Sequence, residues 1–118
     1  KSEIIIYDEP TAGLDPLNSE MLEEVLEKLS AEGKTMLIST HDVNFVYRWA
    51  ERVIVFSQGK LIADGTPLEI FQNKEVLEQA NLKQPTLMEV YDVLVANRIL
   101  DDRQAYPKNM EAFKLLFY

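Results

Sequence analysis

What the sequence lacks already narrows the classes of protein it can encode. None of its 118 residues is cysteine, so it has neither a disulfide framework nor a thiolate metal site. Basic residues are scarce, because 12 Lys and Arg stand against 20 Asp and Glu, a formal net charge of −8. Non-specific nucleic-acid binding depends on Lys and Arg that displace counterions, so we expect no nucleic-acid partner. The longest apolar runs, "IIIY" and "VIVF", are far shorter than the ~20 residues of a membrane-spanning helix.

Glycine is scarce as well, and its four copies stand singly, at Gly13, Gly33, Gly59 and Gly65. The pattern G-x-x-x-x-G-K-[ST], whose backbone N–H groups cradle nucleotide phosphates, therefore occurs nowhere in the chain. The chain starts Lys1-Ser2-Glu3 and enters a strand-like run directly, without an initiator Met or a signal-peptide pattern. We expect the natural protein to extend upstream of this start.

The first two thirds of the sequence alternate between strand and helix patterns. Residues 3–7 form a short β-branched run whose apolar part, "IIIY", is continuous rather than alternating, which is typical of a strand buried on both faces. Asp15 as N-cap and Pro16 at the first helical position predict the start of an amphipathic helix, and Gly33 its left-handed C-cap. "KTMLIST" predicts a second strand, "HDVNFVYRWAER" a shorter helix and "VIVFS" a third strand. The order β-α-β-α-β with short links predicts a parallel sheet.

The pattern then changes twice. Gln58-Gly59 predicts a hairpin between "VIVFS" and "KLIAD", so the sheet should finish with an antiparallel pair. After "DGTP" come several short helical stretches, with prolines between them. The sequence thus predicts an α/β domain over residues 1–66 and a helical C-terminal appendage over residues 67–118.

Acidic and imidazole side chains lie where two of the predicted strands end. Asp8 and Glu9 follow the first strand, and His41 follows the second. Ligands of an open parallel sheet bind outside the carboxyl ends of its strands. Adjacent strand residues point to opposite faces, so one reasonable division has Asp8 holding Mg²⁺ and Glu9 positioning an attacking water. Phosphoryl transfer needs both functions, and His41 could donate to the transferred γ-phosphate.

Each of these features also has a simpler structural explanation. An Asp-Glu pair after an apolar run is commonly the start of a solvated loop, and a lone His before Asp commonly lies beside a helix cap. Asp15 is fully explained as a helix cap. Singly, none of them would indicate a function.

In combination and in this order, "IIIYDEP", "TAGLDP" and "LISTHD" resemble the Walker B segment, D-loop and H-loop of ATP-binding-cassette (ABC) ATPases. "VIVFSQGKLIADGTPLEIF" resembles the hairpin that closes this domain in transporter members, and the resemblance covers roughly residues 3–72. "DEPTAGLDP" and "LKQPTLMEVYDVL" are most similar to ATPase subunits of cobalt/nickel-type and energy-coupling-factor importers. The resemblance implies an α/β fold: a partial P-loop NTPase-like parallel sheet (βαβαβ), an antiparallel hairpin and a small helical C-terminal region.

The resemblance also implies roles for individual residues. Asp8 would serve the Mg²⁺ that accompanies ATP, Glu9 would be the catalytic base and His41 would contact the γ-phosphate. The D-loop positions Gly13, Leu14 and Asp15 would cross the interface to a second ABC ATPase domain, in a homodimer or a heterodimer. The other implied partners are transmembrane transporter subunits, with the ATPase peripheral on the cytoplasmic face of the membrane.

The family's phosphate-binding loop, Q-loop and "LSGGQ"-type signature precede Walker B and are absent from this chain. The sequence therefore predicts the C-terminal part of an ATP-hydrolysing transporter subunit, with cobalt or nickel as candidate cargo. By itself the chain is expected to be inactive and to bind neither ATP nor Mg²⁺. Without upstream strands its sheet would expose an apolar edge, so we also expect it to dimerise, to swap an element or to order poorly.

The sequence leaves two other functions open. The chain could be part of a non-transport ABC ATPase of DNA repair or translation, against which the acidic balance and the closing hairpin weigh. It could also be a non-catalytic module whose helical tail dimerises or regulates. The transported substrate and the role of residues 73–118 cannot be read from the sequence.

Overall fold

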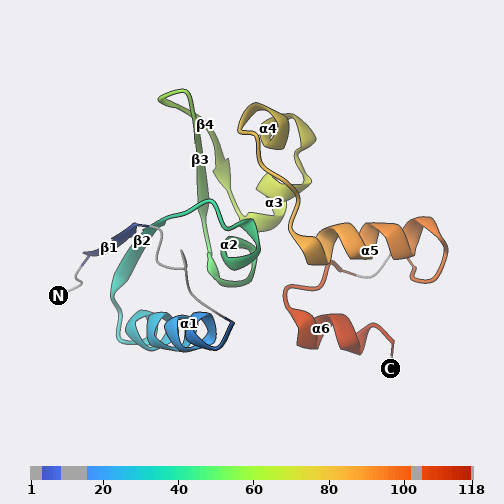
Figure 1. Ribbon diagram of the computed structural model, residues 1–118, viewed down its shortest axis with the longest axis horizontal. Helices are drawn as coiled ribbons and strands as arrows, with labels where there is room; N and C mark the ends of the chain where they lie inside the picture. The colour runs from blue at the N-terminus through green and yellow to red at the C-terminus, as the bar shows by residue number, and fades with distance from the viewer. Residues whose placement is uncertain (1–3, 9–15, 102–104, 118) are drawn as a thin grey trace. The chain divides into compact units, whose positions relative to one another are not determined.

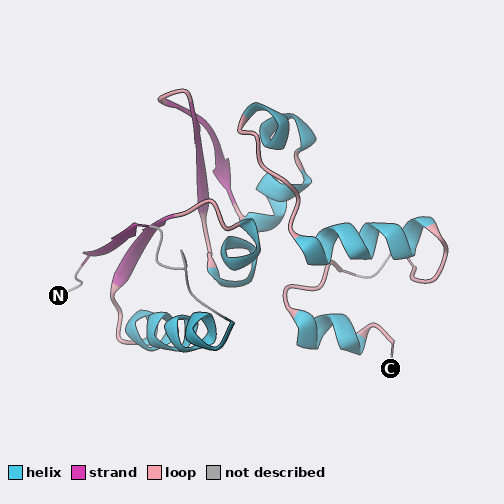
Figure 2. Cartoon of the chain, viewed as in Figure 1, coloured by secondary structure: helices cyan, strands magenta, loops and turns pink. Residues whose placement is uncertain are grey.

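The computed structural model describes residues 4–8, 16–101 and 105–117 (Figure 1). It contains two compact units, residues 1–42 and 43–118. In the described residues, a helix lies between the two strands of the first unit, and the second unit has one helix, then two consecutive strands, then helices alone (Figure 2). None of the helices in the described ranges is both long and apolar enough to cross a bilayer. The sequence predicted a boundary between an α/β domain, residues 1–66, and a helical appendage, residues 67–118. This boundary stays a prediction.

In its described residues, the first unit contains a parallel pair of strands and one helix. β1 (Ile4–Asp8) and β2 (Thr35–Ser39) pair in register, from Ile4 opposite Thr35 to Asp8 opposite Ser39. α1 (Pro16–Ala31) connects them. This confirms the predicted β-α-β start, whereas the predicted N-cap Asp15 lies outside the described residues.

One face of this strand pair is open. Ile4 is 71% exposed, Ile6 69% and Leu37, opposite Ile6, 55%. Burial of the first strand on both faces, expected from its continuous apolar run, is therefore not observed. The physical reason is that a parallel sheet is covered on both faces only when helices lie on both sides, and the described part of this unit contains one helix.

Helix α1 ends as its sequence predicts. Gly33 has a φ of +86°, the left-handed conformation that residues with a Cβ avoid. Its N–H donates to Ser30 O at 3.0 Å, and the N–H of Lys34 donates to Leu29 O at 3.3 Å. This pair of bonds is a Schellman motif, which satisfies carbonyls of the last turn. The apolar side of the helix is only partly covered, since Leu26 is fully buried while three other apolar residues are more than half exposed: Leu17, Met21 and Val25.

The second unit begins with α2 (Val43–Trp49) and an antiparallel hairpin of β3 (Val53–Ser57) and β4 (Lys60–Gly65). Gln58 and Gly59 both have positive φ, 51° and 76°, as a two-residue type I′ turn requires. Ser57 pairs with Lys60 at the turn, and the register shifts between Val55 and Phe56. The predicted hairpin is thus confirmed.

The third strand differs from the sequence-based topology in one respect. In the described residues, β3 pairs with β4 only, and β1 and β2 form a separate two-stranded sheet. A two-residue turn brings β3 and β4 together locally, whereas adding β3 to the parallel pair needs contacts between segments far apart in the chain. The overall class, α/β with a parallel pair, an antiparallel hairpin and C-terminal helices, agrees with the prediction.

Within the residues described after the hairpin there are four short helices: α3 (Pro67–Gln72), α4 (Lys74–Gln79), α5 (Thr86–Ala96) and α6 (Met110–Leu115). Thr66 caps α3 in a capping box, in which its hydroxyl accepts from the N–H of Glu69 and the Glu69 carboxylate accepts from the N–H of Thr66. The hydrogen bond from the Thr66 backbone, followed by one from the Thr66 side chain, lowers the pKa of the Glu69 carboxyl.

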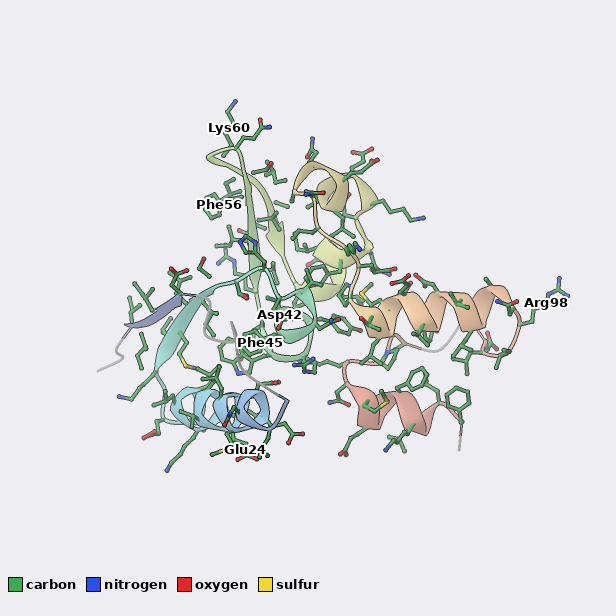
Figure 3. All side chains as sticks on the ribbon, viewed as in Figure 1. Glu24, Asp42, Phe45, Phe56, Lys60 and Arg98 are labelled. Atoms are coloured by element: carbon green, nitrogen blue, oxygen red, sulfur yellow. The ribbon has the colours of Figure 1, made fainter. Side chains whose placement is uncertain are left out.

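The core of the second unit joins the hairpin to the helices. Met88 is fully buried, and Tyr47 of α2 and Phe71 of α3 pack edge to face with ring centroids 6.4 Å apart. The complete buried cluster comprises Tyr47, Val55, Ile70, Phe71, Val76, Leu77 and Met88. The opposite face of the hairpin is open, and Phe56 projects from it on the side away from α3 and α4, 65% exposed (Figure 3). Hairpin and C-terminal helices therefore share one core.

Candidate functional site

Two of the predicted site residues lie at the same end of the parallel strand pair. The register sets Asp8, the last residue of β1, opposite Ser39, the last residue of β2. His41 follows Ser39 by two residues, and the side chains of Asp8 and His41 are both exposed. Because the strands are parallel, these residues lie at their carboxyl ends, where open sheets bind ligands.

The loop that carries His41 is shaped by a hydroxyl group. The N–H of Asp42 donates to Thr40 Oγ1 at 3.0 Å. This bond closes a side-chain turn in which His41 is the middle residue. Ser and Thr hydroxyls commonly form such turns just before a helix. Thr40 was not identified from the sequence, although a hydroxyl residue two positions before the start of a predicted helix is a signal for such a turn.

The other predicted site residues are not described by the structure. Glu9, the predicted catalytic base, and Gly13, Leu14 and Asp15, the predicted D-loop, lie outside the described residues. Their roles therefore stay predictions.

Helix α2, which begins directly after Asp42, is bonded to the C-terminal part of the chain. Asn44 Oδ1 accepts a hydrogen bond from the N–H of Thr86 at 2.8 Å. The hydroxyl of Tyr47 donates to the carbonyl oxygen of Pro107 at 2.6 Å, in a buried position. The sequence did not predict these bonds, because they join residues 42 and 60 positions apart.

The Tyr47 side chain is buried, and its burial changes the pKa of the hydroxyl. The side chain is 4% exposed, and burial, followed by the nearby Tyr106, raises its pKa to about 12. Tyr47 therefore stays a neutral hydrogen-bond donor at physiological pH. On the opposite face of the helix, Phe45 is 1% exposed and stacks on Trp49, with ring centroids 5.8 Å apart.

A second polar network lies on α5. The hydroxyl of Tyr106 donates to Asp92 Oδ1 at 2.6 Å, and Gln84 Nε2 donates to Asp92 Oδ2 at 3.1 Å. Burial, followed by the Asp92 carboxylate, raises the pKa of Tyr106 to about 12. Its ring also packs on Tyr91, with centroids 4.6 Å apart. These bonds join residues 84, 92 and 106.

The part of the chain that the structure describes holds no group of three or more His, Asp or Glu residues that could bind a metal by themselves. Asp8 therefore belongs to no such group among the described residues.

The chain is similar in sequence to ATP-binding proteins of transporters. It is 48% identical over 88 residues to an energy-coupling factor transporter ATP-binding protein of Methanospirillum hungatei, a match that covers 75% of this chain and 22% of the relative. It is 49% identical over 85 residues to the corresponding protein of Methanothermobacter thermautotrophicus, covering 72% of this chain and 27% of the relative. The chain thus spans about a quarter of the length of these relatives.

A solved structure agrees with the sequence relatives. CbiO1 of Clostridium perfringens, described as part of an ABC transporter complex, matches with a TM-score of 0.55 and 35% identity, over 79% of this chain and 36% of that chain. The structure of another ATP-binding subunit of an ABC transporter matches with a TM-score of 0.54 and 32% identity. No protein-family model matches the chain. From its sequence relatives and its structural neighbours, the chain belongs to the family of ATP-binding proteins of ABC transporters.

Proposed function

We propose that this chain is the C-terminal part of an ATP-binding subunit that hydrolyses ATP to drive transport through a membrane complex. One observation carries the proposal: the register of β1 and β2 brings Asp8 and the His41 loop to the same edge, in a chain of this family. This is the position at which parallel sheets bind nucleotides.

The proposed roles follow from the side-chain chemistry. Asp8 supplies carboxylate oxygens for Mg²⁺, and its exposure leaves them accessible to a cation that arrives with a nucleotide. His41 supplies an imidazole N–H for a γ-phosphate oxygen, on a loop that the Thr40 hydroxyl shapes. Glu9 is the general base that orients and deprotonates the attacking water. The Mg²⁺ ion, when bound, supplies neutralisation of phosphate charge.

A phosphate-binding loop must come from outside this chain. An acidic sequence without a G-x-x-x-x-G-K-[ST] motif has little with which to offset the charge of ATP. We therefore propose that residues upstream of Lys1 supply this loop and that the present chain binds ATP weakly or not at all. A second ATPase domain would meet Gly13, Leu14 and Asp15.

The relatives support the proposed partners and location. The names of the relatives describe transporter ATP-binding proteins, and CbiO1 is described as part of a transporter complex. We propose that the whole protein associates with transmembrane subunits at the cytoplasmic face of the membrane. Transport of cobalt or nickel stays a prediction from the sequence. The choice of cargo would depend on other subunits of the transporter.

The first experiment is a titration of the purified chain with Mg²⁺-ATP by calorimetry, with phosphate release assayed in parallel. We expect no binding up to millimolar ATP and no turnover. Micromolar affinity, or turnover that Glu9→Gln abolishes, would show that the chain builds a phosphate site by itself and would contradict the proposal that this site lies upstream.

The second experiment uses the whole protein with the upstream segment. Loss of a general base typically slows a reaction about 10²–10⁴-fold, so Glu9→Gln should lower kcat by this order. Glu24→Gln is the matched control, since Glu24 is exposed on α1 (Figure 3). Full ATPase activity in Glu9→Gln would remove Glu9 from the proposed mechanism.

A further inference from the structure

Residues 105–117, which we call the C-terminal arm, are held near their start by two tyrosine hydroxyls. Tyr106 of the arm donates to Asp92 Oδ1 of α5 at 2.6 Å. Tyr47 of α2 donates to the carbonyl oxygen of Pro107 at 2.6 Å. The Tyr106 ring also packs on the ring of Tyr91, with centroids 4.6 Å apart. The arm is therefore joined to α2 and α5 through its second and third residues.

Beyond these residues the arm is less tightly packed. None of the six residues of α6 is buried, and the structure describes all six. Met110 is 53% exposed, Leu115 is 70% exposed and Phe117, which follows the helix, is 51% exposed. The rings of Phe113 and Phe117 pack on each other, so part of the apolar contact of the arm is internal to it. Since burial of apolar surface is the main source of stability, α6 itself contributes little to holding the arm closed.

The core of the unit is built largely without the arm. Its described buried members come from residues 47–88, and Tyr106 packs against them from outside while only partly buried. Opening of the arm would therefore remove few of the contacts on which this core depends. Segments with few buried apolar contacts open at a lower free energy than the whole structure unfolds.

From these contacts we propose that the C-terminal arm is a latch that opens while the core of its unit stays folded, with the hydrogen bond from Tyr106 to Asp92 as its catch. Opening separates Pro107 from the Tyr47 hydroxyl and Tyr106 from the Tyr91 ring. The closed arm thus masks an aromatic surface of α2 and α5. All of these residues lie in the unit of residues 43–118, so the inference is independent of the proposed catalytic roles.

Hydrogen exchange of the full chain, followed by NMR, measures the opening. Helices shorter than about 12–15 residues are marginal by themselves in water, so the amides of the short helix α6 are protected only while the arm is closed. The N–H of Phe113, bonded to Asn109 O at 3.0 Å, reports on the arm. The N–H of Ile70, a buried residue bonded to Thr66 O at 3.0 Å, reports on the core.

We expect the Phe113 amide to exchange faster than the Ile70 amide, with a rate that low concentrations of urea hardly change, because a local opening exposes little surface. Tyr106→Phe should speed exchange at Phe113 about 2–10-fold, the factor that corresponds to loss of a typical hydrogen bond. An unchanged rate at Phe113 in this variant would overturn the proposal.

The matched control is Val55→Ala, which weakens the core at a residue of β3 that is 6% exposed. Because the core stays folded when the latch opens, Val55→Ala should speed exchange at Ile70 and leave Phe113 unchanged. Faster exchange at both amides in Val55→Ala would mean that the arm opens only when the whole unit unfolds, and it would refute the latch.

A double-mutant cycle tests whether Tyr106 acts through Asp92. In an Asp92→Ala background, Tyr106→Phe should speed exchange at Phe113 less than it does in the parent chain, because the bond is already absent. Equal factors in the two backgrounds would show that this hydrogen bond is not the catch. Cleavage by trypsin after Lys114, which is exposed on α6, is a second readout, since the helix must open before the protease can act. It should be faster in Tyr106→Phe and unchanged in Val55→Ala, and the reverse order would contradict the proposal.

Discussion

Replacing Tyr47 with Phe removes one hydroxyl group and leaves the shape of the ring unchanged. The hydroxyl donates to Pro107 O at 2.6 Å, and both Tyr47, 4% exposed, and Pro107 are buried. Water cannot easily replace the lost donor, so the carbonyl oxygen of Pro107 is left without this partner. An unsatisfied buried polar group costs about 1–3 kcal/mol, and we expect the free energy of unfolding to fall by this amount.

Urea denaturation followed by circular dichroism measures this change, with an unchanged m-value indicating that the same surface is exposed on unfolding. Each kcal/mol should lower Tm by about 4–8 °C for a unit of this size. Tyr106→Phe is the matched control, because its hydroxyl makes an equally short bond, 2.6 Å, but to the exposed carboxylate of Asp92. Water can solvate that carboxylate after the change, so the loss should be smaller.

The pH dependence of stability provides an independent check on Tyr47. Its pKa in the folded state, about 12, lies above the ordinary value of 10.0 for a tyrosine side chain. A raised pKa means that the contribution to stability is complete below pH 10 and is lost as the pH rises toward 12. The parent chain should therefore lose stability over this range, and Tyr47→Phe should lose less. In the urea experiment, a decrease in the free energy of unfolding for Tyr106→Phe that equals or exceeds the decrease for Tyr47→Phe would refute the argument. It would mean that burial of the hydrogen bond does not decide how much the bond contributes to stability.

Three further changes test the fold at separate places. Met88→Ala should lower the free energy of unfolding by about 2–5 kcal/mol, measured by urea denaturation, because Met88 is fully buried and its loss leaves a cavity. Gly33→Ala should cost about 1–2 kcal/mol in the same assay, since Gly33 has a φ of +86° and a Cβ there would meet no neighbouring atom, so that backbone strain alone acts; Gly33→Asn should cost less, and equal losses would contradict this. The Arg52 hydrogen bond keeps the pKa of Asp64 below its usual value of 3.8, so the stability from this pair is present above pH 3.8 and is lost on further acidification. Thermal melts of Asp64→Asn should therefore show a weaker loss below pH 3.8 than those of the parent chain, and identical acid profiles would refute it.

Features that depend on a few neighbouring residues were predictable from the sequence. Gly33 ends α1 because only glycine adopts its conformation at little cost, and Gln58-Gly59 form the hairpin turn because both take positive φ. The order of strands and helices follows from hydrophobic periodicity, which is also local. For the candidate site, the placement of Asp8 and His41 at strand ends followed from strand boundaries alone.

Tertiary structure decided what the local pattern leaves open. The apolar run of β1 could not reveal that Ile4 and Ile6 are exposed, because burial depends on what covers each face of the sheet. Nor could the sequence reveal that Asn44 caps a helix 42 residues away or that Tyr47 reaches Pro107 across 60 residues. Such bonds depend on how elements pack, and no local propensity encodes a partner at that separation. The sequence by itself therefore determined the elements, the family resemblance and the candidate catalytic residues, while the fold alone determined which elements bond to the helix that follows His41.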